Sequence, residues 1–287
     1  MSRCLVTGHR GYIGSHLVKA LEEAGHEVLG IDLVEGHDIK KDLKDKFHPH
    51  YYNFKPEYVF HLACFPRVAY SVENPVITME NNVLCTSCVL DFAKQVGAKR
   101  VIYSSSSSVV GNGNGPTSPY ALQKLVSEME CKLYSDLYDL DTVSLRYFNV
   151  YSEDQTVDGP YCTAIANWMD SIRKGVNPYI TGEGDQCRDM LHVSDAVRAN
   201  IFAMTRKGDF NGEHYDIGTG TNISLNEIKE IVQKNLPSVR FDYVGKRKGD
   251  VLFTCAKTDK IKQLGWQTSV AIKEGINKCF ERLKNEK

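Results

Sequence analysis

A glycine-rich turn near the N-terminus restricts the possible folds more than any other stretch of this sequence. It spans residues 7–14, directly after a short apolar run at 4–6 and directly before an amphipathic pattern at 15–24. This order of strand, turn and helix begins a dinucleotide-binding βαβ unit, in which glycines let a pyrophosphate approach the helix N-terminus. An ordinary α/β turn without a dinucleotide is the alternative. The glycines of the turn are Gly8, Gly11 and Gly14.

The strand that follows predicts which dinucleotide is bound. An apolar pattern at 26–31 ends in Asp32. A carboxylate here can accept hydrogen bonds from an adenosine ribose and disfavours a 2′-phosphate. We therefore expect NAD rather than NADP.

Strand and helix patterns then alternate along the chain. Apolar strands are predicted at 58–63, 100–103 and 140–147, with a crossover helix at 81–96. Alternation of this kind predicts an α/β fold with a doubly wound parallel sheet of Rossmann type, whose ligand lies at the carboxyl ends of the strands. The serine tract at 104–108 falls at such an end. It could be a flexible linker, but its place between a buried strand and a helix favours a hydroxyl-lined site.

A cluster of Asp, Gly and Pro at 158–160 predicts a domain boundary. We expect an NAD-binding domain at 1–157, to which a later segment near 187–218 returns. Residues 158–287 would form a smaller α/β substrate-binding region.

A tyrosine and a lysine lie four residues apart where a helix should begin. Ser118 is a good N-cap and Pro119 suits the first turn, so Tyr120 and Lys124 would share one helix face. A nearby cation favours phenolate, and we expect the pKa of Tyr120 to fall toward neutrality, as a general acid or base requires. The alternative is a surface pair with little effect.

Charge and hydropathy exclude some partners. The chain of 287 residues has 35 Lys and Arg against 36 Asp and Glu, a net charge of −1. We therefore expect neither nucleic acid nor an anionic membrane as partner. No apolar span approaches twenty residues, which predicts a soluble, cytoplasmic protein.

The cysteines predict reduced thiols rather than a disulfide framework, because their number is nine and they lie scattered in apolar contexts. Cys85 and Cys88 form a C-x-x-C pair inside a helical pattern, without a second pair nearby. Core packing is favoured there over a zinc or redox site, and we expect no metal.

Taken together, these stretches resemble the extended short-chain dehydrogenase/reductase family, and within it the nucleotide-sugar epimerase and dehydratase branch. The resemblance covers nearly the whole chain, and its motifs come in the family's order. The matching motifs are T-G-x-x-G-x-x-G at 7–14, H-L-A at 61–63, the serine-rich strand end at 104–108, Y-x-x-x-K at 120–124, R-Y-F-N-V-Y at 146–151, R-D-x-x-H-V-x-D at 188–195 and R-x-G-D at 247–250.

The resemblance implies a role for each matching residue. Tyr120 would be the catalytic acid and base, Lys124 would lower its pKa and bind the nicotinamide ribose, and Ser106 would bind the reacting sugar oxygen. His192 and Asp195 are interpreted as structural. The residues implied to bind the cofactor are Gly8, Gly11, Tyr12, Ile13, Gly14, Asp32, Asp42, Leu43, Leu62, Ala63 and Lys124. Those implied to bind substrate are Ser106, Ser107, Asn149, Arg188 and Arg247, although each arginine could instead form a structural ion pair.

Departures from the family pattern narrow the reaction. Dehydratases of this branch have Thr-Asp-Glu in the serine tract, and decarboxylases keep a glutamate there, whereas this chain has Ser107 and Ser108. The missing acid favours epimerisation. The connection at 111–118 is shorter than is usual in the family, and Val110 replaces its tyrosine, so the sugar stays open.

The expected function is therefore NAD-dependent epimerisation of a nucleotide sugar, at C4 of a UDP-hexose or derivative, through a 4-keto sugar. Two alternatives stay open: net oxidation or reduction of a nucleotide-linked sugar on the same fold, and a non-catalytic NAD-binding module. The resemblance also implies a homodimer, formed through 81–96 and 120–136.

Overall fold

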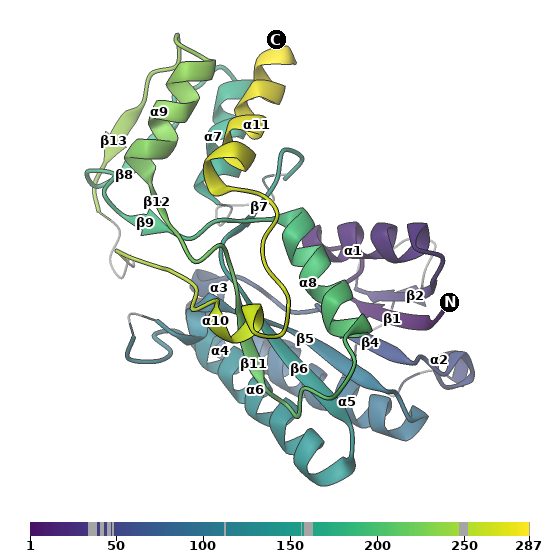
Figure 1. Ribbon diagram of the computed structural model, residues 1–287. Helices are drawn as coiled ribbons and strands as arrows, with labels where there is room; N and C mark the ends of the chain where they lie inside the picture. Colours follow the sequence, from purple (N-terminus) through teal and green to yellow (C-terminus); the bar gives the residue numbers. More distant parts are fainter. Residues whose placement is uncertain are drawn as a thin grey trace. The chain divides into compact units, whose positions relative to one another are not determined.

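The computed structural model describes residues 1–33, 39–40, 43–44, 47, 49–111, 113–155, 157, 163–246 and 252–286 (Figure 1). The chain divides into two compact units. The first comprises Met1–Arg146 and Val197–Tyr215, and the second comprises Tyr147–Ala196 and Asp216–Lys287. The domain limits expected from the sequence stay a prediction, and these packing units begin and end at other residues.

The sheet to which the first unit contributes has seven strands in the order β11-β6-β5-β4-β1-β2-β3. The pairs β1–β2, β1–β4, β4–β5 and β2–β3 are parallel. Strand order therefore reverses between β1 and β4, which is where a doubly wound sheet binds its ligand. The predicted fold class is confirmed. The strands are β1 (Arg3–Thr7), β2 (Glu27–Asp32), β3 (Ile39–Lys40), β4 (Tyr58–His61), β5 (Arg100–Ser106), β6 (Asp141–Tyr147) and β11 (His214–Ile217).

Helices cover both faces of this sheet. Side chains alternate along a strand, so neighbouring residues of β1 face opposite ways. Leu5 packs in one apolar core with Val89 and Phe92 of α5. The next residue back, Cys4, faces α8, and its sulfur lies 3.8 Å from that of Met204. The helices of this part of the chain are α1 (Tyr12–Glu23), α2 (Pro49–Phe54), α3 (Val68–Glu73), α4 (Pro75–Met79), the π-helix η1 (Glu80–Leu84), α5 (Cys85–Val96), the 3₁₀ turn η2 (Ser107–Val109), α6 (Pro119–Tyr138) and α8 (Val193–Thr205).

The second unit has its own core, formed mainly by three helices. Trp168, Ile228 and Phe280 are buried there, one from each of α7, α9 and α11. Ser224 begins α9 with a reciprocal capping box, in which Glu227 returns a bond to the backbone of Ser224. The remaining elements are β7 (Val150–Tyr151), α7 (Ala164–Arg173), β8 (Tyr179–Thr181), β9 (Cys187–Arg188), β10 (Leu191–His192), β12 (Ile223–Ser224), α9 (Leu225–Asn235), β13 (Asp242–Val244), α10 (Asp259–Lys262) and α11 (Ile272–Asn285).

The cysteine pair lies in the core of the first unit. Cys85 is 3% exposed, and Cys88 packs against the same cluster. Within the described ranges, no group of three or more His, Cys, Asp or Glu side chains could hold a metal ion. No helix among the residues described is long and apolar enough to cross a membrane.

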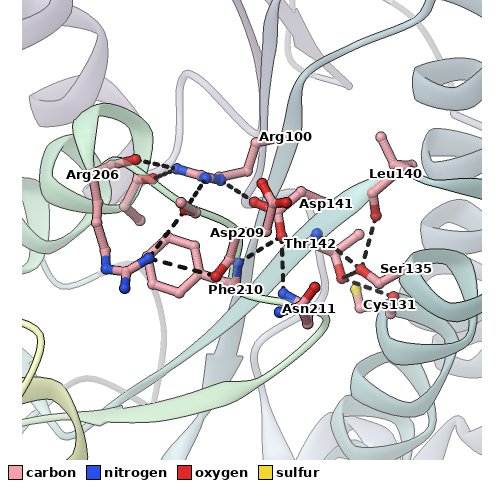
Figure 2. Close-up of polar contacts among 12 residues, drawn as sticks. Arg100, Cys131, Ser135, Leu140, Asp141, Thr142, Arg206, Asp209, Phe210 and Asn211 are labelled. Atoms are coloured by element: carbon pink, nitrogen blue, oxygen red, sulfur yellow. Dashed lines mark hydrogen bonds and ion pairs between the residues drawn. The ribbon is translucent and has the colours of Figure 1, made fainter.

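A buried ion pair holds residues 197–215, the later segment of the first unit, against the sheet (Figure 2). Arg100 begins β5, Asp141 begins β6, and the Arg100 Nε pairs with the Asp141 carboxylate. The guanidinium also donates to the carbonyl oxygens of Ala203 (2.5 Å) and Gly208 (2.8 Å). The second carboxylate oxygen accepts from the Phe210 amide at 2.8 Å. Every charge in this network is therefore compensated by hydrogen bonds, as burial requires.

Replacing Asp141 with asparagine would leave the Arg100 charge, 6% exposed, without its counter-ion. Breaking a buried pair in this way costs about 3–5 kcal/mol of unfolding free energy, measurable by urea denaturation. Asp136→Asn is the matched control, because Asp136 pairs with Lys132 at the surface, where such a pair is worth under about 1 kcal/mol. Equal losses in the two variants would contradict the assigned role.

Candidate active site

The glycine-rich turn packs directly against the end of β4. Gly8 has a φ of +70°, and a Cβ at this position would lie 2.7 Å from the Ala63 nitrogen. A Cβ on Gly14 would lie 2.1 Å from the Gly8 carbonyl oxygen. Only glycine fits both positions, so the turn packs closely at the N-terminus of α1. A dinucleotide pyrophosphate suits such a cradle.

The residues expected to contact the cofactor come from several elements of the first unit. Asp32 ends β2, and its carboxylate accepts a hydrogen bond from the Arg10 amide at 3.0 Å. Ala63 follows β4, and its amide donates to the Thr7 hydroxyl at 3.3 Å. Tyr12 and Ile13 are half-buried at the start of α1, Leu62 is half-buried after β4, and Leu43 is 6% exposed. Asp42 lies outside the described residues.

A histidine buried beneath the site was not assigned a role from the sequence. His61 bonds through Nδ1 to the Thr7 hydroxyl (2.7 Å) and through Nε2 to the Thr86 hydroxyl (3.0 Å). Burial, and secondarily the charge of Lys124, lowers the pKa of His61 to about 3. The imidazole is therefore neutral at physiological pH, and it ties the end of β1 to α5. Its H-L-A motif was the only sequence signal for it.

Tyr120, Lys124 and Ser106 lie together at the carboxyl end of β5. Ser118 caps α6 by accepting a bond from the Ala121 amide at 3.2 Å, so the pair begins its helix as predicted. The Lys124 ammonium donates to the Ser104 carbonyl at 2.6 Å and lies 5.9 Å from the centre of the Tyr120 ring. The Ser106 side chain lies beside the Tyr120 phenol, close enough to favour phenolate. Both Tyr120 and Lys124 are buried, so neither is part of a surface pair.

The pKa of Tyr120 differs from the sequence-based expectation. Burial raises it to about 12, although the Lys124 charge and the Ser106 side chain act in the opposite direction. The expectation of a pKa near neutrality was wrong for the protein alone, because desolvation outweighs one neighbouring ammonium. Further positive charge beside the phenol is needed to form phenolate at neutral pH.

The residues expected to bind substrate lie on different elements. Ser107 begins the 3₁₀ turn after Ser106 in the first unit. Asn149 and Arg188 belong to the second unit. The side-chain Nδ2 of Asn149 donates to the Asp189 carbonyl at 2.7 Å, and the Arg188 guanidinium donates to the Cys187 carbonyl at 3.0 Å. Arg247 lies outside the described residues.

Asp189, which the sequence did not single out, anchors this part of the second unit. It is fully buried, and its carboxylate accepts bonds from the amides of Thr219, Gly220 and Ala256. Asp195 similarly holds the amides of Ser269 and Val270. The histidine of the same motif, His192, bonds to Ser194 and Glu153. These contacts agree with the structural interpretation of His192 and Asp195.

Comparisons with known proteins agree with this geometry. The model of the NAD dependent epimerase/dehydratase family matches residues 4–218. A putative UDP-glucose 4-epimerase from Methanocaldococcus jannaschii is 34% identical, with 98% of each chain covered. The UDP-glucose 4-epimerase of Thermotoga maritima, solved with UDP-glucose, is 30% identical with a TM-score of 0.90, covering 99% of each chain. That of Thermus thermophilus, solved with NAD, is 27% identical with a TM-score of 0.86, covering 98% of this chain and 99% of the other.

The buried His61 makes stability sensitive to acid. Its folded pKa of about 3 lies below the ordinary 6.5, so between these values only the unfolded chain binds the proton. The stabilising contribution is present above pH 6.5 and is lost as pH falls toward 3, by about 2 kcal/mol between pH 7 and pH 5. In His61→Gln, urea denaturation at these two pH values should show a loss smaller by about that amount. The exposed His50→Gln control should lose as much as wild type, and an undiminished loss in His61→Gln would contradict the assignment.

Proposed function

The chain belongs to the NAD-dependent epimerase/dehydratase family, and we propose that it epimerises a nucleotide sugar at C4, with a UDP-hexose as the substrate class. One observation carries the proposal above all. The buried Tyr120 and Lys124 and the half-buried Ser106 form a single cluster at the carboxyl end of β5, the strand that pairs with β4 next to the switch point. The similarity to UDP-glucose 4-epimerases over nearly the whole chain supports the same reaction.

The first unit supplies the residues that would hold NAD. Gly8, Gly11 and Gly14 would let the pyrophosphate approach the backbone, Asp32 would bind the adenosine ribose, and Lys124 would bind the nicotinamide ribose. Leu62 and Ala63 line the end of β4, and Asp42 and Leu43 are assigned to the adenine. When bound, NAD would supply reversible hydride transfer at C4, and its oxidised nicotinamide ring would bring positive charge to the site.

The chain's own groups move the proton. Tyr120 Oη removes the proton of the C4 hydroxyl and later returns it to the oxygen of the 4-keto sugar. Ser106, which lies beside Tyr120, binds that same sugar oxygen and keeps it within reach of the phenol. Lys124 opposes the burial that raises the pKa of Tyr120. Because the cofactor returns to its starting state, no external oxidant is needed.

The serine tract supports epimerisation over elimination. Loss of a C6 hydroxyl needs an acid in this tract, and the chain has Ser107 and Ser108 there. We assign Ser107 to substrate binding, and Asn149, Arg188 and Arg247 to the nucleotide diphosphate, for which amide and guanidinium donors are suited. The substrate and the reduced thiols fit a location in the cytoplasm.

We also propose a homodimer, which would be formed through α6 and the neighbouring α4, η1 and α5. Large apolar side chains on α6 recur at spacings of seven and four residues, so they share one helix face. Contiguous exposed apolar area of this kind marks an interaction surface. The side chains on α6 are Leu122 (47% exposed), Met129 (64%), Leu133 (51%) and Leu137 (61%), and Val76 (70%), Ile77 (47%) and Leu84 (48%) add to them from α4 and η1.

Incubation with UDP-glucose, UDP-galactose and their N-acetyl and uronate forms tests the function, with proton NMR of C4 as the readout. We expect interconversion of one C4 pair without net absorbance change at 340 nm. Tyr120→Phe should keep NAD and lose about 10²–10⁴-fold in rate, the usual contribution of a general acid-base group. Stoichiometric absorbance change would instead indicate a net oxidoreductase, and retained NAD without turnover would indicate a binding module.

Leu133→Lys tests the dimer, because it places a charge in the middle of the apolar face of α6. Sedimentation velocity should show a shift from dimer to monomer. Leu252→Lys is the matched control. Leu252 is 71% exposed and belongs to the second unit, whereas α6 belongs to the first. A monomeric wild type, or a Leu133→Lys protein that stays dimeric, would refute this interface.

A further inference from the structure

Gln123 precedes Lys124 on α6, but its side chain contacts different elements. It is fully buried. Its Oε1 accepts a hydrogen bond from the side-chain Nδ2 of Asn82 at 2.8 Å. Its Nε2 donates to the Thr78 hydroxyl at 2.9 Å and to the Pro75 carbonyl at 3.4 Å. These partners belong to α4 and η1. Gln123 therefore attaches the first turns of α6 to residues 75–82.

Asn82 extends this connection to the segment after β4. Its Oδ1 accepts from the Phe65 amide at 2.7 Å, and its Nδ2 lies 3.3 Å from the Phe65 carbonyl. Phe65 follows closely on Leu62 and Ala63, which are assigned to the cofactor. Asn82 is 2% exposed and lies in η1, and π-helical turns are rare and occur often at functional sites. The side chain of Asn82 thus connects Gln123 with residues 62–65, the segment after β4 that contains the residues assigned to the cofactor.

The backbone carbonyl of Asn82 is held as well. It accepts bonds from the hydroxyls of Thr86 at 2.7 Å and Ser127 at 3.2 Å. Ser127 lies on α6, one turn beyond Lys124. Asn82 therefore contacts α6 at two points, through the side chain of Gln123 and through that of Ser127. A hydrogen-bonded network of buried groups with all members satisfied holds its elements rigidly.

The same turns of α6 are held on another side by the catalytic groups themselves. Lys124 donates to the Ser104 carbonyl, and the Tyr120 phenol lies beside the Ser106 side chain, both at the end of β5. The Tyr120 amide also donates to the Ser71 hydroxyl at 3.0 Å, on α3. Without Gln123, the Tyr120–Lys124 turn would keep its contacts to β5 and α3, and α6 would keep the bond from Ser127 to Asn82. The turn that carries the two catalytic groups would lose its own bond to Asn82.

We propose that Gln123 is a positioning residue for the epimerisation, which through Asn82 and Thr78 sets the place of Tyr120 and Lys124 relative to residues 62–65. The proposal rests on the function proposed above. Gln123 is buried away from solvent and acts through these neighbours. Because the groups assigned to the diphosphate lie on other elements, its loss should lower kcat and leave KM nearly unchanged.

Gln123→Met tests the proposal, because methionine keeps the length of the side chain and removes all its hydrogen bonds. We expect kcat with UDP-glucose to fall about tenfold and KM to stay within about twofold. Thr78→Val removes only one partner and should show a smaller fall of the same kind, which keeps the test open if Gln123→Met folds poorly. Gln95→Met, the same change at an exposed position of α5, should leave both constants unaltered. A raised KM with unchanged kcat would overturn the proposal.

A second readout separates positioning from mere stability. In NAD-loaded protein labelled with 3-fluorotyrosine, the ¹⁹F resonance of Tyr120 is assigned by its disappearance in Tyr120→Phe. It should move in Gln123→Met and Thr78→Val and stay in place in Gln95→Met. A lowered melting temperature with an unmoved Tyr120 resonance would overturn the proposal. If the wild type epimerises no sugar, the proposed function fails, while this resonance still decides whether Gln123 positions Tyr120.

Discussion

The parallel pairing of β1 with β4 is the constraint on which the rest of the site depends. It places Thr7 opposite His61, so that both strands end at the same edge of the sheet. Strand order reverses there, and the segments after the two strands lie against each other without side chains between them. The glycine-rich turn follows β1 and leads into the N-terminus of α1, and the serine tract lies at the end of β5. Cofactor and catalytic groups are thereby assigned to neighbouring strand ends.

Two opposing effects meet at Tyr120. Burial stabilises the neutral phenol, whereas the Lys124 ammonium and the Ser106 hydroxyl stabilise phenolate, and burial prevails. With its pKa raised in this way, the Tyr120 phenol stays protonated at neutral pH until further positive charge is placed beside it. The cationic ring of an oxidised nicotinamide has the required sign, so the base would become active only in the loaded enzyme. The same burial lowers the pKa of His61, which keeps a second positive charge away from Lys124.

Buried polar side chains connect the elements around the site. Sequence patterns could not predict which residues these side chains bond to. His61 is separated by 54 residues from Thr7, and Gln123 by 41 from Asn82. Helical and strand periodicity report only on neighbours a few residues apart. Arg100 and Asp141 likewise lie on two different strands, 41 residues apart in the chain, yet they pair in the interior. Unpaired, each of these groups would destabilise the fold, so the network also selects one arrangement of the chain.

The sequence by itself determined the parallel α/β fold, the position of the glycine-rich turn, the start of α6 at Ser118 and the pairing of Tyr120 with Lys124 on one face. Each of these follows from spacing within one element or between adjacent ones, where backbone geometry leaves few choices. Tertiary structure alone decided the direction in which the pKa of Tyr120 moves, the neutral state of His61, the anchoring by Asp189 and the bridge from Gln123 to Asn82. Those properties depend on desolvation and on contacts between distant segments, which exist only once the elements have packed.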